Sequence, residues 1–150
     1  MVLDAAGIWW RGHTYVHDPA NTSYGLEAAS ALGVEVASVY KTLIAQVEGL
    51  GLVVGIVPVA ALLDLKALAQ ATGGKRGAMA AALIAERSSG YVVGGISPIG
   101  QRKPLPTYLD EGAIVQERIF VSGGRRGFDI EIAPGDLLSV VGGQYAKIAR

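Results

Sequence analysis

Apolar runs in this chain are short, and their spacing changes between a helical period and the alternation of strands. Periodic spacing and capping residues predict helices at residues 2–6, 24–32, 64–71, 79–86 and 135–141. Stretches rich in β-branched and aromatic residues predict strands at residues 12–17, 36–48, 52–59, 91–93, 107–110, 119–122 and 128–132. Residues 111–117 predict a turn or brief helix, and a polar tail follows residue 141. With no internal repeat or linker, this mixture predicts an α+β fold in one domain, residues 1–150.

Two of these segments carry clear boundary signals. Thr22-Ser23 can cap the helix that starts at Tyr24, and Gly33 can end it. The buried stripe of that helix is expected to be Leu26, Ala29 and Leu32. Farther along, the glycines at 49 and 51 join the strands on either side into a hairpin.

The amino-acid composition excludes several classes of protein and of functional site. The chain is 51% hydrophobic, but no apolar run approaches the roughly 18 residues of a membrane span. We see no secretory signal, and the absence of cysteine excludes disulfides, thiolate metal sites and a cysteine nucleophile. Lysine plus arginine and aspartate plus glutamate each total 13, so a polyanion would have to bind local basic patches.

The stretch Gly90–Gly100, which reads GYVVGGISPIG, offers the most distinctive candidate site. Paired glycines at 94 and 95 allow backbone conformations closed to other residues and leave N–H groups uncovered. Successive N–H groups in such a bend can converge on an anion, and Pro98 fixes the exit angle. From the local pattern alone, an ordinary strand-to-loop turn is the favoured interpretation. Two hypotheses therefore stand: a plain turn, or a cradle for developing negative charge.

Lys41 lies in a predicted strand with Val39 and Leu43 on the same face. A lysine in this setting can reach past an edge strand into solvent and protect that edge from aggregation. Alternatively, its ammonium group lies at the floor of a pocket. There it could bind a phosphate, or a carbonyl oxygen that gains charge during a reaction.

The serine and histidine candidates do not fit a serine nucleophile or a metal site. Ser97 misses the G-x-S-x-G nucleophile pattern by one residue, and Pro98 has no N–H to donate to an oxyanion. We expect Ser97 to order the bend and its hydroxyl to touch a ligand. His13 and His17 lie four positions apart on a predicted strand, about 13 Å, which is too far to share one ion. The sequence thus predicts no metal site and no cofactor.

Basic pairs stand at three predicted turns, namely Lys75-Arg76, Arg102-Lys103 and Arg125-Arg126. Each alone is typical of a solvated turn. The last two pairs lie after the glycine-rich stretch and in the final hairpin, so together they could ring one opening and bind phosphates in a salt-sensitive way. This inventory fits a site that binds a charged ester while a group from outside the protein attacks it.

Several of these segments resemble the YbaK-type proteins, free-standing relatives of the editing domain inserted in bacterial prolyl-tRNA synthetases. The matching segments are Val39–Leu43, Gly90–Gly100, Lys103–Pro106 and Val121–Glu131. His13–Pro19 is similar to the Cys-tRNA(Pro) deacylase branch, and the resemblance runs in unbroken order from about Leu3 to the C-terminus. Members usually begin with a fuller first helix, so we expect either a shortened helix here or a different start site.

The resemblance implies a mixed sheet curled into a small barrel with helices around it. It also implies clearing of mischarged tRNA in trans, chiefly Cys-tRNA(Pro) with Cys-tRNA(Cys) as a further candidate. Its partners would be aminoacyl-tRNA and prolyl-tRNA synthetase, in the cytoplasm and away from membranes, and we expect a monomer. In that branch the substrate's own thiol attacks the ester and leaves as a cyclic thiolactone. Two alternatives remain: an Ala-tRNA(Pro) deacylase of the same fold, or a non-catalytic module that binds tRNA or the synthetase.

The resemblance assigns roles to individual positions as well. The catalytic positions it implies are Lys41, Gly94, Gly95 and Ser97. The positions it implies for substrate binding are Tyr15, Tyr24, Thr42, Pro98, Ile99, Gly100 and Asp129. Contacts to tRNA are expected from Arg102, Lys103, Arg125 and Arg126.

Overall fold

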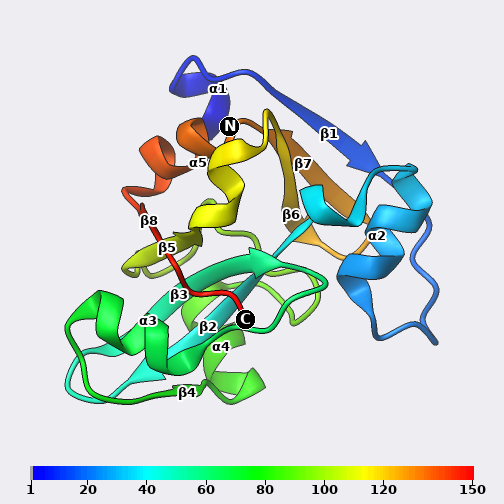
Figure 1. The fold of residues 1–150 in the computed structure, drawn as a ribbon. Coiled ribbons are helices and arrows are strands. Elements are labelled where there is room, and N and C mark those ends of the chain that lie inside the picture. Colours follow the sequence, from blue (N-terminus) through cyan, green and yellow to red (C-terminus); the bar gives the residue numbers. More distant parts are fainter. Residues whose placement is uncertain (1) are drawn as a thin grey trace.

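The structure, a computed structural model, describes residues 2–150 and consists of two β-sheets with helices packed around them (Figure 1). Its α-helices and 3-10 helices are α1 Val2–Ala5, α2 Tyr24–Leu32, η1 Val36–Ser38, α3 Leu65–Thr72, α4 Ala82–Ser89, η2 Glu111–Val115 and α5 Pro134–Val141. Its strands are β1 Trp10–Thr14, β2 Tyr40–Val47, β3 Gly51–Pro58, β4 Gly77–Met79, β5 Thr107–Asp110, β6 Ile119–Arg125, β7 Phe128–Ile132 and β8 Gln144–Ala146. The predicted α+β class is confirmed.

Residues 91–93 form no strand, because Tyr91 lies in a bend and Val93 in a turn, so the strand that their side chains predict is wrong. Helix α4 continues to Ser89, and Gly90 ends it in the left-handed conformation with φ of 83°. Val93 then donates its N–H to the Glu86 carboxylate at 2.9 Å, and its carbonyl accepts from Arg126. Side chains thus satisfy backbone groups that a sheet ladder would otherwise pair.

Other helix and strand boundaries also differ from the predicted ones, because pairing between distant segments overrides local pattern. The first strand lies at 10–14, because the small sheet pairs those residues with β7. Residues 36–38 form η1 before β2 begins, and β4 precedes the helix predicted at 79–86. The tail predicted to be polar contains β8, which pairs with β5 in parallel.

The strands form two open sheets. The small sheet has the order β1-β7-β6 and is antiparallel, whereas the large sheet has the order β4-β2-β3-β5-β8 and mixes antiparallel with parallel pairs. The mixed sheet is therefore confirmed, but the small barrel is wrong. Within residues 2–150 the two sheets are joined by one bridge, between Val39 and Phe120. A barrel needs a continuous ladder of tilted strands, which one bridge does not supply.

The main core lies between the two sheets and fixes their relative position. Ile44 and Ile56 of the large sheet meet Ile119, Val121 and Ile130 of the small sheet in one buried cluster. Fully burying one such side chain stabilises the fold by roughly 2–3 kcal/mol. Helix α3 covers the opposite face of the large sheet, and α2 packs against Phe120 on the opposite face of the small sheet.

Strand β2 has a free edge along its first half, and this edge positions the candidate site. β4 pairs with β2 only at Ala45–Val47, and Ala80 donates to the Ile44 carbonyl, so Lys41–Leu43 pair with β3 alone. Helix α2 stands near this edge beside the small sheet (Figure 1). Within residues 2–150 we find no helix that combines the length and the apolar character of a bilayer span.

Candidate active site

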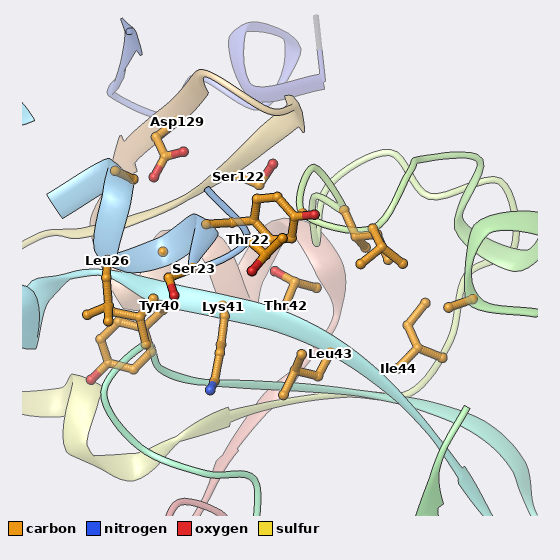
Figure 2. A pocket seen from close by; sticks show the side chains of 18 of the residues that line it. Thr22, Ser23, Leu26, Tyr40, Lys41, Thr42, Leu43, Ile44, Ser122 and Asp129 are labelled. Atoms are coloured by element: carbon orange, nitrogen blue, oxygen red, sulfur yellow. The ribbon is translucent and has the colours of Figure 1, made fainter. Parts of the chain in front are cut away.

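A cavity of about 500 Å³ opens beside the free edge of β2, and both sheets contribute to its walls (Figure 2). Strand β2 supplies Tyr40–Ile44, and the small sheet supplies Ser122 and Asp129. The other walls come mainly from Tyr15, the start of α2, the β4–α4 connection and the loop residues Val93, Gly94 and Ile96. The cavity thus collects residues from segments that are far apart in the sequence.

Six of the positions predicted to be functional line this cavity. They are Tyr15, Tyr24, Lys41, Thr42, Gly94 and Asp129. They come from β2, β7, the glycine-rich loop and the segments around β1 and α2. The structure therefore brings together the lysine, the glycine loop and the acidic residue that the sequence placed about 88 positions apart, from 41 to 129.

Thr42 presents unpaired polar groups at the free edge of β2. Val59 donates to the Val39 carbonyl and Ala80 to the Ile44 carbonyl, so antiparallel alternation points the N–H and C=O of Thr42 away from β3. Its hydroxyl is buried and has no hydrogen-bond partner within residues 2–150. Since buried polar groups are usually paired, Thr42 is poised to bind a polar ligand.

Lys41 and Leu43 point to the other face of β2, next to the free edge. In Figure 2 the Lys41 side chain extends from β2 away from Asp129. Within the described chain no carboxylate lies within 4.0 Å of its ammonium group. Burial alone lowers the pKa of Lys41 from its ordinary value. The cavity therefore holds a cation whose charge a bound anion would stabilise.

The opposite wall carries Tyr15 and Asp129. Asp129 is only 6% exposed, and burial raises its pKa to about 6, while the charge of His13 acts in the opposite direction. Burial also raises the pKa of Tyr15, and the neighbouring Asp129 charge adds to that effect. The wall thus offers a neutral hydroxyl beside a carboxyl that titrates close to neutral pH.

The glycine-rich loop approaches other segments closely. Gly94 has φ of 87°, and a Cβ there would meet the Tyr24 ring at 2.8 Å. A Cβ on Gly95 would lie 2.8 Å from the Arg125 Cα, so both positions require glycine for packing. The Gly95 N–H donates to the Val92 carbonyl at 2.8 Å and is already used. The N–H groups of Gly94 and Ile96 donate to no other group in residues 2–150 and border the cavity.

Arg126 clamps this loop onto α2. Its Nε and Nη2 donate to the Val93 carbonyl at 2.9 and 2.6 Å, and its guanidinium lies 4.7 Å from the centre of the Tyr24 ring. The sequence analysis predicted that Arg126 contacts tRNA. The structure places it in the frame of the cavity, where it fixes the loop against the helix that faces it.

The second half of the predicted loop lies outside the cavity. Ser97 is 1% exposed, and its hydroxyl accepts from the Ile99 N–H at 3.2 Å. This bond matches the expectation that Ser97 orders the bend, but its hydroxyl does not face the cavity. Ile99 is buried in the core, whereas Pro98 and Gly100 border a separate cavity of about 210 Å³.

The two basic pairs near the loop lie around one tyrosine. Tyr91 donates its hydroxyl to the Ile99 carbonyl, and its ring lies against Gly124 in the β6–β7 turn. Arg102 packs beside Gly90, next to this tyrosine in the chain. Arg102, Lys103 and Arg125 are all exposed. These three exposed cations are called the basic region below, and cations of this kind can bind phosphates.

Sequence reasoning missed several residues of the cavity. Ser23 occupies the N-cap position of α2 but makes no side-chain cap bond, and with Thr22 it borders the cavity. Leu26 was expected to be buried, yet it is 47% exposed at the mouth together with Met79. The signal available was the missing capping box, because Glu27 stands one position too late and binds His17 instead.

Both histidines pair with carboxylates. His13 Nε2 lies 2.8 Å from Glu131, and His17 Nδ1 lies 2.6 Å from Glu27. Neither histidine borders the cavity. Within residues 2–150 no three His, Cys, Asp or Glu side chains group closely enough to hold a metal ion.

Two open sheets with a cavity at the free edge of β2 define an α+β domain. Within that class, the chain belongs to the aminoacyl-tRNA editing domain family, whose model matches residues 17–140. The match includes β2, the glycine-rich loop and Asp129, which carry the site. The resemblance that the motifs indicate is therefore confirmed.

Known relatives agree with this family. A protein of Enterococcus faecalis, provisionally assigned as a Cys-tRNA(Pro)/Cys-tRNA(Cys) deacylase and called EbsC, is 44% identical over 120 residues, which is 80% of this chain and 73% of that protein. A solved structure provisionally assigned as a trans-editing enzyme for prolyl-tRNA synthetase has a TM-score of 0.83 and 29% identity, covering 99% of this chain and 92% of the other. A hypothetical protein of known structure has a TM-score of 0.87 and 25% identity over 99% and 96%.

Proposed function

We propose that this chain is a trans-editing aminoacyl-tRNA deacylase that clears Cys-tRNA(Pro), with Cys-tRNA(Cys) as a second substrate. Family membership and the name of the 44% identical relative support the reaction class. The observation that carries the proposal is the cavity itself. Its lining includes Lys41 together with Gly94 and Ile96, whose N–H groups donate to no other group in residues 2–150, and such a set suits an ester that develops negative charge.

The proposed chemistry uses the substrate's thiol as nucleophile. The cysteine sulfur attacks the ester carbonyl carbon and forms a C–S bond, which leaves negative charge on the carbonyl oxygen. Collapse of this intermediate breaks the C–O bond to the ribose. The ribose oxygen takes up a proton equivalent to the one the thiol loses, so the products are uncharged tRNA and a cyclic thiolactone. This route agrees with a cavity that no histidine borders within residues 2–150.

In this scheme the chain's residues bind the aminoacyl ester and stabilise the oxyanion that forms on it. The N–H groups of Gly94 and Ile96 donate to the oxyanion, and each such donor is worth roughly 3 kcal/mol. Lys41 stabilises the same charge or the neighbouring phosphate. Thr42, Tyr15 and Tyr24 hold the aminoacyl end, while Gly95 and Ser97 shape the loop behind it. Pro98, Ile99 and Gly100 then contribute by supporting that loop and not by contact with the ester.

The proposed partners are aminoacyl-tRNA and prolyl-tRNA synthetase in the cytoplasm, where tRNA is charged. The basic region of Arg102, Lys103 and Arg125 is the proposed contact for the tRNA backbone. The similar solved structure, which is provisionally assigned as a trans-editing enzyme for prolyl-tRNA synthetase, supports this synthetase as the partner.

Release of labelled amino acid from Cys-tRNA(Pro) and Ala-tRNA(Pro), measured side by side, tests the proposal. We expect loss of the Cys ester well above its spontaneous rate and no such gain for the Ala ester, which lacks a thiol. Lys41→Ala should lower kcat/KM for the Cys ester on the order of 100-fold, because one charged donor contributes about 3 kcal/mol. Lys147→Ala, which changes an exposed lysine next to β8, is the matched control and should keep its rate.

Three outcomes would contradict parts of this proposal. Equal release of alanine would assign the attack to water and remove the thiol route. An unchanged rate for Lys41→Ala would remove the lysine from the chemistry. Binding of tRNA without loss of either ester, even at high protein concentration, would make the chain a non-catalytic module.

A further inference from the structure

Charges of opposite sign lie apart in the cavity. Asp129 projects from β7 of the small sheet, and Lys41 projects from β2 of the large sheet (Figure 2). Both border the cavity, yet no ion pair joins them within 4.0 Å. A ligand with a positive and a negative end could satisfy both groups at once.

Asp129 lacks the hydrogen bonds that a buried carboxylate normally has. Asp110 is buried to a similar degree, at 7% exposed, and accepts from the N–H groups of Gly112, Ile148 and Ala149 at 3.0, 3.1 and 2.9 Å. Within residues 2–150 no side chain or backbone group donates to the Asp129 carboxylate. The same fold thus satisfies one buried aspartate fully and leaves the other open toward the cavity.

The neighbours of Asp129 cannot supply its missing partner. His13 stands opposite Asp129 in the β1–β7 register, but its Nε2 already contacts Glu131 at 2.8 Å. Tyr15 donates no hydrogen bond to the carboxylate. A buried carboxylate is costly unless a charged or hydrogen-bonding partner reaches it, so the partner has to enter through the cavity. A compact cation with several N–H donors suits a carboxylate that has no donor of its own.

An aminoacyl ester carries such a group next to its carbonyl carbon. Building on the proposed deacylase function, we infer that Asp129 binds the free α-ammonium group of the aminoacyl ester. The protein would then favour esters with an unblocked amine over N-acylated, peptidyl-type esters. N-acylation removes the positive charge and adds bulk where the carboxylate is buried. Editing would thereby spare chains that are already being elongated.

The test compares three esters on the same tRNA(Pro): cysteine, N-acetylcysteine and 3-mercaptopropionate. All keep the thiol, and the last lacks the amine without adding bulk, which separates charge from size. Each rate is divided by the spontaneous rate of the same ester. We expect kcat/KM to fall roughly 10- to 100-fold for both amine-blocked and amine-free esters, the value of one charged hydrogen bond.

Asp129→Asn supplies the second measurement. It keeps the shape of the side chain, so we expect a similar loss on the cysteine ester but rates within about threefold of one another across the three esters. Thermal unfolding of the variant confirms that it is folded. Wild-type rates that are equal for all three esters would overturn the inference while leaving the deacylase function intact. Failure of the wild type on cysteine itself would instead reject the proposed function.

Discussion

Asp129 is expected to lower the stability of the folded protein, because its carboxyl group is buried beside the cavity without a hydrogen-bond partner in residues 2–150. The titratable groups near it are His13 of β1 and Tyr15, which follows β1, and only the His13 charge favours its ionised form. Its pKa in the folded protein, about 6, lies above the ordinary value of 3.8. The folded state therefore binds a proton more tightly than the unfolded state, and stability falls as pH rises through this window.

Asp129→Asn should accordingly be more stable than the wild type above pH 6. We expect a gain on the order of 1–3 kcal/mol in the free energy of unfolding at pH 8, since each pKa unit corresponds to about 1.4 kcal/mol. The gain should be largely lost near pH 4, where Asp129 is protonated in the folded state and about half protonated in the unfolded state. Urea unfolding at the two pH values measures it.

Asp110→Asn is the matched control for this experiment. It weakens three hydrogen bonds from backbone N–H groups, so it should lower stability at pH 8. A loss of stability for Asp129→Asn at pH 8 would mean that Asp129 has a stabilising partner in the folded state.

At the scale of elements, the glycine-rich loop depends on residues outside it. Glu86 of α4 accepts the Val93 N–H, and Arg126 of the β6–β7 turn binds the Val93 carbonyl. Tyr24 of α2 then lies under the Arg126 guanidinium. These contacts hold the loop in which Gly94 and Ile96 border the cavity, so we expect small shifts of α2 or of the turn to displace both residues.

Arg126→Lys should test this positioning. Lysine keeps the charge, but as a single ammonium group it cannot reproduce the paired donors of the guanidinium. We expect kcat for Cys-tRNA(Pro) to fall about 10-fold with little change in KM, because displaced donors weaken the transition state. Single-turnover and steady-state deacylation assays separate the two constants.

Arg118→Lys is a suitable comparison, because Arg118 stacks on Trp9 outside the cavity. It should behave as the wild type. A higher KM with unchanged kcat for Arg126→Lys would instead support the tRNA contact that the family resemblance implies.

At the scale of the molecule, recognition of tRNA has to come from local charge. The formal net charge is zero, so long-range attraction is weak, and we expect the exposed basic region of Arg102, Lys103 and Arg125 to supply the phosphate contacts. Replacing all three by serine should raise KM for Cys-tRNA(Pro) and flatten its salt dependence. The slope of log KM against log salt should fall by about 2, at roughly 0.7–0.9 per phosphate contact.

Lys147→Ser removes one exposed charge near β8 and serves as the control for that measurement. An unchanged salt slope for the triple variant would move the tRNA contact to another surface. Unchanged KM together with an altered kcat would instead indicate that the loop around Tyr91 has been disturbed.

Much of the fold could be predicted from local pattern. Alternating apolar residues locate β7, the glycines at 49 and 51 locate the β2–β3 turn, and Gly33 ends α2 in the left-handed conformation. These features follow from side-chain period and glycine stereochemistry, which act over a few residues. The barrel could not be judged in this way, because closure depends on whether two sheets pair at their edges.

Some residues of the candidate site could be predicted from the sequence, and others could not. Lys41 and the glycine loop are readable as motifs, whereas Leu26 and Ser23 look like an ordinary helix stripe and cap. Their place at the cavity mouth depends on how α2 packs beside the edge of β2. Residues 91–93 were misjudged for a related reason, since Glu86 and Arg126 satisfy their backbone from outside the segment.

The sequence by itself determined most of the elements, the α+β class and the family, because period, turn residues and long motifs are local properties of the chain. Only the tertiary structure decided that the sheets stay open and that Asp129 and Lys41 share one cavity. It also decided which loop N–H groups remain free to bind a ligand. Those outcomes depend on hydrogen bonds and burial between distant segments, and one residue's neighbours in sequence do not specify them.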